Sequence, residues 1–138
     1  MRLQLALNVK NIDDAVQYYS KLFNSKPHKR KDGYANFAIA NPPLKLVLLE
    51  DKAADSRINH LGVEVLPGED LNVEIDRLQQ SSLVDKVEGQ TNCCYAIQDK
   101  AWTTEPEGLK WEWYQIIDDN PAENTACESG VCCANDRR

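Results

Sequence analysis

Apolar and polar positions alternate at the start of the chain. Every second residue from Leu3 to Val9 is a large aliphatic one, a pattern typical of a strand with one buried face. Asn11 follows and is a residue type that caps helices. Apolar residues then recur at helical spacing: Ile12, Val16, Tyr19 and Phe23. The pattern predicts a strand over residues 3–9 and a helix from residue 12 to about residue 24.

Short segments with strand character come next. Residues 34–39 and 45–50 are separated by a turn at Asn41-Pro42-Pro43, and residues 26–30 are a weaker candidate strand. The basic cluster Lys29-Arg30-Lys31 stands beside a turn signal at Asp32-Gly33, which favours a solvated loop over a phosphate site.

The same order of elements then begins again. Residues 61–65 alternate, and Pro67-Gly68 makes a turn that opens a second helix, whose apolar face is Leu71, Ile75 and Leu78. Further strands are predicted near residues 84–88, 93–98 and 111–117. The best register between the two halves places Gln4 over His60. Internal repeats of this kind fix the architecture of a chain.

Two repeated units of one strand, one helix and about three strands predict an α+β fold. A single unit cannot bury the open face of its sheet, whereas two units side by side can, with the helices outside and the sheets curved into a cup. We therefore predict one domain at residues 1–117 built from two tandem βαβββ modules, module one at 1–50 and module two at 58–117. The short linker at 51–57 permits a cup within one chain or a cup made of modules swapped across a homodimer.

The remaining segment differs from the rest of the chain. Residues 118–138 lack apolar periodicity and are predicted to form a flexible tail. This tail carries Cys127, Cys132 and Cys133, whose role the pattern does not decide.

Charge and composition exclude several classes of function. The formal net charge of −6 disfavours a nucleic-acid binder. No apolar run is long enough to span a membrane, and the N-terminal segment is too polar for a signal peptide. We expect a cytoplasmic protein in a reducing compartment, so the five cysteines are thiols or metal ligands rather than a disulfide framework.

Strand parity brings three donor side chains to one face. If the leucines of the first strand and Leu61 and Val63 pack under the helices, Gln4 and His60 turn into the cup, and Glu112 lies on the opposite face from Trp111 and Trp113. An amide, an imidazole and a carboxylate suit a divalent first-row metal with open positions. The repeat places a fourth position near Leu46, which cannot ligate. The alternative is that His60 is a satisfied buried histidine.

The adjacent thiols Cys93-Cys94 are a second candidate site. Two neighbouring thiolates suit soft centres such as trivalent arsenic or Cd²⁺. The alternative is two small residues buried at the start of a strand. Since adjacent strand residues face opposite sides, both thiols can reach one ligand only if the backbone there is irregular.

The segments NHLGVEV and GLKWEWYQI resemble the vicinal oxygen chelate superfamily, which includes glyoxalase I, bleomycin-resistance proteins and extradiol dioxygenases. The resemblance covers about residues 1–117. GYANFAIANPPLKLVL, CCYAIQDK and the Cys-rich tail are similar to bacterial C–As lyases, the Fe(II)-dependent organoarsenical demethylases, and to cadmium-induced proteins.

The resemblance implies a function and its residues. Gln4, His60 and Glu112 match the Fe(II) ligands of the lyases, in a site that other divalent metals can occupy, and Cys93 and Cys94 match the thiol pair that binds trivalent methylarsenic. The implied activity is O2-dependent cleavage of the carbon–arsenic bond of a small organoarsenical such as methylarsenite. The alternatives are a non-catalytic arsenic- or cadmium-binding resistance protein, or another glyoxalase-fold dioxygenase or binding protein.

Overall fold

The structure is a computed structural model that describes residues 1–93 and 95–121, without the side chain of Cys93. Module one consists of β1 (Arg2–Val9), α1 (Ile12–Leu22), β2 (Lys29–Lys31), β3 (Tyr34–Ile39) and β4 (Leu44–Glu50). Module two consists of β5 (Ile58–Glu64), α2 (Leu71–Gln80), β6 (Val84–Cys93), β7 (Ala96–Thr104) and β8 (Lys110–Asp118). The predicted α+β repeat of two βαβββ modules is confirmed.

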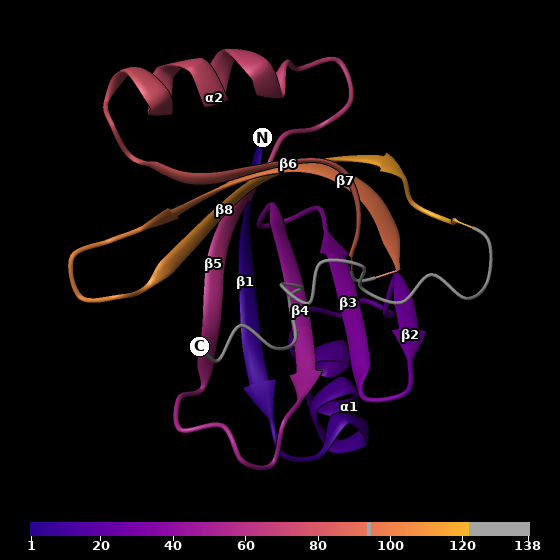
Figure 1. The fold of residues 1–138 in the computed structure, drawn as a ribbon. Coiled ribbons are helices and arrows are strands. Elements are labelled where there is room, and N and C mark those ends of the chain that lie inside the picture. The colour runs from indigo at the N-terminus through magenta and orange to yellow at the C-terminus, as the bar shows by residue number, and fades with distance from the viewer. Residues whose placement is uncertain (94, 122–138) are drawn as a thin grey trace.

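All eight strands in the described part of the chain form one mixed sheet in the order β2-β3-β4-β1-β5-β8-β7-β6. β1 is parallel to β4 and β5 is parallel to β8, while β1 and β5 pair antiparallel at the centre. The sheet is strongly curved, and β6, β7 and β8 arch over one end of the strands of module one (Figure 1). The strands of both modules thus form one continuous curved sheet.

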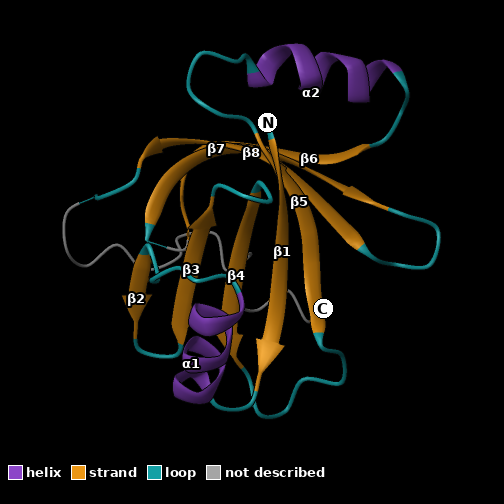
Figure 2. Ribbon diagram, turned by 180° about the vertical axis from the view of Figure 1, so that it is seen from behind, coloured by secondary structure: helices purple, strands orange, loops and turns teal. Residues whose placement is uncertain are grey.

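The helices lie on the outside of this cup. α1 packs on β3 and β4, and α2 lies across β6, β7 and β8 (Figure 2). The side chain of Asn11 caps α1 by accepting from the Asp14 amide at 3.0 Å, as predicted. α2 begins at Leu71, because Gly68 takes a positive φ of 91° that ends the turn and Asp70 supplies the cap.

Each helix covers its own apolar cluster. Buried residues under α1 are Leu7, Val9, Ile12, Ala35, Phe37, Ile39, Leu46 and Leu48. Buried residues under α2 are Val65, Leu71, Ile75 and Ala101. Leu3 is instead 57% exposed, and Leu61 and Val63 are only half-buried. Their predicted packing under the helices is wrong, whereas Leu7 does pack under α1 as predicted. α1 contacts β3 and β4 and α2 contacts β6, β7 and β8, so Leu3, Leu61 and Val63 lie outside the two buried clusters.

Two local predictions also fail. Residues 93–98 are not one strand: β6 ends at Cys93, β7 starts at Ala96, and Cys93 pairs with Ala96 across a tight turn. Tyr95 in that turn has a positive φ of 63°, which a strand does not allow. Lys29–Lys31 is strand β2, paired with β3, rather than a solvated loop.

The second thiol, Cys94, and the three cysteines predicted for the tail, Cys127, Cys132 and Cys133, lie outside the described residues. β8 extends to Asp118, and Asp119 still makes side-chain contacts with module one, one residue past the end of the strand.

Candidate metal centre

Three strands bring the predicted ligands together inside the cup. Gln4 on β1, His60 on β5 and Glu112 on β8 are at most 5% exposed. His60 Nε2 lies 3.0 Å from the Gln4 carboxamide nitrogen and 2.9 Å from Glu112 Oε2. Gln4 comes from module one and the other two from module two, so that the donor set forms only when the modules pair.

A chain of hydrogen bonds fixes which ring nitrogen of His60 faces the cup. Asn59 Nδ2 donates to Asn8 Oδ1 at 3.1 Å, which leaves Asn59 Oδ1 as the acceptor 2.7 Å from His60 Nδ1. The proton of neutral His60 is therefore on Nδ1, and Nε2 presents a lone pair to the cup.

This assignment explains why the site suits a cation. The lone pair of His60 Nε2 faces Glu112 Oε2, and that buried oxygen has no hydrogen-bond partner among the described residues. Turning the Gln4 carboxamide by 180° directs its oxygen to the same point. Three electron-pair donors then converge on one point, and a divalent ion at that point would interact with all three. Within the described ranges no three His, Cys, Asp or Glu side chains gather at one point, so a metal here needs an amide ligand.

Gly62 allows the strands that carry the three donors to lie close together. It lies opposite Gln4 across the β1–β5 pair and opposite Glu112 across the β5–β8 pair. A Cβ at this position would stand 2.7 Å from the Glu112 backbone oxygen and 3.4 Å from Gln4 Nε2. The absence of a side chain thus allows the ligand-bearing strands to approach each other closely.

A buried lysine holds the other oxygen of the carboxylate. Lys100 on β7 is fully buried, and its Nζ lies 3.0 Å from Glu112 Oε1. Burial alone raises the pKa of Glu112, but the Lys100 ammonium, the strongest of the opposing groups, acts against burial, and the net result is a pKa of about 2. Glu112 is therefore an anion at any physiological pH.

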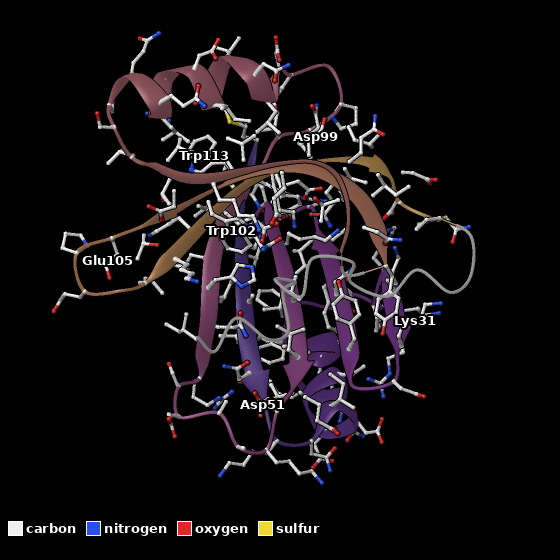
Figure 3. All side chains as sticks on the ribbon, viewed as in Figure 1. Lys31, Asp51, Asp99, Trp102, Glu105 and Trp113 are labelled. Atoms are coloured by element: carbon white, nitrogen blue, oxygen red, sulfur yellow. The ribbon has the colours of Figure 1, made fainter. Side chains whose placement is uncertain are left out.

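An aromatic wall closes the site on one side. Trp102 on β7 points into the cup, where its ring meets His60 edge-on at 5.3 Å, whereas Trp113 on β8 points outward beneath α2 (Figure 3). The Arg77 guanidinium lies 5.3 Å from the Trp113 ring. The predicted opposite faces of Glu112 and Trp113 are confirmed.

A cavity extends from the donor set toward the β6–β7 turn. The lining residues are Gln4, Tyr34, Asn36, Lys45, Val47, Ala96, Gln98, Glu112, Tyr114, Ile116 and Asp119.

Leu46, predicted to occupy the fourth ligand position, is part of the core under α1 instead. The residue of module one that corresponds to Glu112 is Val47, since Val47 pairs with Ala6 as Glu112 pairs with Gly62. The prediction of Leu46 is off by one residue, and the position is still apolar.

Module one also anchors the turn that carries the thiol motif. Lys29 Nζ donates to the Tyr95 carbonyl at 2.7 Å and to the backbone and side-chain oxygens of Asp119 at 2.5 and 3.1 Å. Asp119 Oδ2 lies 2.6 Å from His28 Nε2, and the Tyr34 and Tyr95 rings meet edge-on at 5.3 Å. Burial tends to raise the pKa of Asp119, but His28 and Lys29 lower it overall.

Sequence reasoning named the three donors but missed the groups around them. Lys100 closes the CCYAIQDK motif, and its even spacing from Gln98 along a strand was the available indication that it points inward. Lys45, placed between two leucines of a strand, gave the same kind of indication. Asn59, next to His60, gave none.

The model of the Glyoxalase/Bleomycin resistance protein/Dioxygenase superfamily matches residues 3–113. The chain belongs to this superfamily. Among the superfamily's solved structures, the Mn(II)-bound glyoxalase from Novosphingobium aromaticivorans shares the fold, with a TM-score of 0.58, 14% identity, and coverage of 93% of this chain and 45% of that chain.

Two relatives within the superfamily are much more similar in sequence. The cadmium-induced protein CadI of Mycobacterium bovis is 49% identical over 140 residues, which cover 96% of this chain and 92% of the relative. The trivalent organoarsenical cleaving enzyme of Thermomonospora curvata is 46% identical over 136 residues, which cover 98% of this chain and 90% of that enzyme. Neither helix of this superfamily member within the described residues has the length and apolar character needed to cross a membrane.

Proposed function

We propose that this protein cleaves the carbon–arsenic bond of trivalent organoarsenicals such as methylarsenite, in a reaction that uses Fe(II) and O2. The observation that carries the proposal is the convergence of Gln4, His60 and Glu112 on one buried point. The similarity to an enzyme named for organoarsenical cleavage supports the choice of reaction.

The roles of the donors follow from their chemistry. One amide oxygen, one imidazole nitrogen and one carboxylate oxygen hold the metal and leave positions open. Fe(II) in such a site supplies the binding and activation of dioxygen. Asn59 orients His60, and Lys100 binds one oxygen of Glu112 so that the other is directed at the metal.

The substrate is bound through sulfur. Cys93 and Cys94 capture trivalent arsenic, a soft centre that thiolates prefer. β6 ends at Cys93, and the turn that follows is tied to β2 through Lys29 and Tyr95. A captured arsenical would thus lie at the end of the cavity whose other end is the metal centre, which is catalysis by positioning.

A second function is supported by the relatives named for cadmium induction. In that case the thiols sequester Cd²⁺ or arsenic without turnover, and the Gln4–His60–Glu112 set has no catalytic role. The thiols would bind arsenic in the same way in cleavage and in sequestration, so only the formation of product distinguishes the two functions.

The test is to load the full-length, reduced protein with Fe(II) under nitrogen, add methylarsenite and admit air. We expect inorganic arsenite in amounts exceeding the protein. Stoichiometric binding of arsenic without arsenite release would favour sequestration.

Variants separate the two sites. His60→Ala is expected to abolish stoichiometric Fe(II) binding, whereas His28→Ala, a change at the other histidine, should retain it. Cys93→Ser and Cys94→Ser should each lose high-affinity methylarsenite binding while Fe(II) binding persists, and their effects should be strongly non-additive. Normal turnover by the double serine variant would end the proposed role of the thiols.

A further inference from the structure

One wall of the cavity has polar groups that the metal centre does not use. Lys45 on β4 is the register partner of Gln4, lines the same cavity and is only 4% exposed. No hydrogen bond or ion pair engages its ammonium group within the part of the chain that the structure describes. An ammonium on a largely buried side chain is stabilised by an anionic partner.

The charged groups around Lys45 are already engaged with others. The acidic groups that act on Lys45 are Glu64 on β5 and Asp119 after β8, and the basic ones are Arg2 and Lys29. Glu64 Oε1 accepts from Arg2 Nε at 2.7 Å, and Asp119 is paired with His28 and Lys29. These neighbours therefore form pairs among themselves and leave Lys45 as the cation of the wall.

Two further polar groups face the cavity without partners. The Tyr114 hydroxyl and the Asn36 side-chain oxygen are buried and accept or donate no hydrogen bond among the described residues. A phenol hydroxyl can donate a hydrogen bond to a group in the cavity. Asn36 Nδ2 contacts the Tyr34 hydroxyl at 2.9 Å, and turning the carboxamide over lets Tyr34 donate to the oxygen and frees the NH2 for the cavity.

We propose that Lys45, Asn36 and Tyr114 form a subsite for an anionic, oxygen-bearing substituent, such as a carboxylate, on the organic group of the substrate. One ammonium and two neutral donors match the lone pairs of a carboxylate. The subsite shares its cavity with Gln4 and Glu112, so a molecule that reaches the metal centre has the rest of its structure against this wall. The inference rests on the proposed function, and extends its substrate class from methylarsenite to arsenicals that carry an acidic carbon group.

An arsenic-free probe tests the subsite independently of turnover. Binding of benzoate and of neutral benzamide is measured by calorimetry on the full-length protein, both metal-free and metal-loaded. Lys45→Met removes the cation, and Asn36→Asp adds an anion that should repel the probe. Lys45→Arg keeps the positive charge. Lys21→Met, on the exposed surface of α1, is the matched control.

We expect benzoate to bind the wild type and the control more tightly than benzamide, with or without metal. Lys45→Met and Asn36→Asp should weaken benzoate binding by roughly tenfold to a hundredfold and leave benzamide unaffected, and Lys45→Arg should restore most of it. Tyr114→Phe should give a smaller loss. Near-ultraviolet circular dichroism checks that each variant is folded. If Lys45→Met is unfolded, benzoate binding by Asn36→Asp tests the subsite in its place.

Three results would overturn the subsite. The first is no benzoate binding by the wild type. The second is equal binding by the wild type and folded Lys45→Met. The third is binding only when metal is present, which would make the carboxylate a metal ligand.

A kinetic experiment then compares 4-carboxyphenylarsonous acid with phenylarsonous acid. Only the KM for the carboxylated compound should rise in Lys45→Met. If benzoate binds as expected but neither arsenical is cleaved by the wild type, the proposed function fails and the anion subsite stands.

Discussion

Lys100 Nζ and Glu112 Oε1 lie 3.0 Å apart, and neither side chain has more than 3% of its surface exposed. The ion pair joins β7 to β8 at the base of the cup. It binds one carboxylate oxygen of Glu112 and leaves the other, Oε2, facing His60. The pair therefore decides both the charge and the direction of the proposed metal ligand.

Replacing Lys100 by methionine, which has a similar length but no charge, should affect stability and metal binding together. Removing one partner of a buried ion pair typically costs about 3–5 kcal/mol, and loss of a group that orients a ligand lowers metal affinity about 10- to 100-fold. Urea unfolding of the metal-free protein and competition with a chelator measure the two effects. Lys21→Met, a change at an exposed lysine of α1, is the control, and an unchanged metal affinity in folded Lys100→Met would contradict the orienting role.

The stability of the metal-free protein should depend on the ionisation of Glu112. Its pKa is about 2 in the folded chain against an ordinary value of 4.5. Between about pH 2 and pH 4.5 the Glu112 carboxylate is protonated in the unfolded chain but not in the native state. The contribution of Glu112 is therefore complete above about pH 4.5 and is lost as the pH falls toward 2, and it amounts to roughly 3 kcal/mol.

Urea unfolding at a series of pH values from 6 to 2.5 checks this dependence. Glu112→Gln cannot ionise, so its free energy of unfolding should fall less steeply over the acid range than that of the wild type. Parallel curves for the two proteins would show that the ionisation of Glu112 does not contribute in this range.

Gly62→Ala should damage the donor set without adding or removing charge. The new Cβ would stand 2.7 Å from the Glu112 backbone oxygen, and since that atom belongs to a paired strand it cannot move aside alone. We expect a loss of about 1–3 kcal/mol in stability and weaker metal binding. Gly89→Ala is the matched control, because a Cβ at Gly89 would lie no closer than 3.9 Å to the Asp99 side chain. Equal metal affinity in both alanine variants would rule out this steric role.

Lys29→Met should act on the substrate rather than on the metal. Lys29 ties the Tyr95 carbonyl to Asp119 and so holds the β6–β7 turn against module one. Its loss should raise the KM for the arsenical several-fold, since positioning is lost, while the metal content stays at the wild-type value. Lys26→Met, an exposed lysine three residues earlier, should change neither. A fall in metal content in Lys29→Met would show that the contact supports the whole cup.

The sequence by itself determined the repeat and the residues that face inward. Alternation in β1, β5 and β8 has a period of two, so Gln4, His60 and Glu112 lie on the opposite face from the large apolar residues of their strands. The helix cap at Asn11 and the apolar face of α2 depend on local spacing in the same way. Such features need only neighbours in sequence, and they were predicted correctly.

Only the tertiary structure decided what surrounds those residues. That Leu3 is exposed depends on where the helices lie, and that Lys29 is held at the β6–β7 turn depends on the curvature of the sheet. Lys100 reaches Glu112 because β7 pairs with β8, and Lys45 stands beside Gln4 because β4 returns parallel to β1. A strand pattern gives the face of each residue, but the identity of its cross-strand neighbour depends on strand order and register, which are fixed by packing between distant segments.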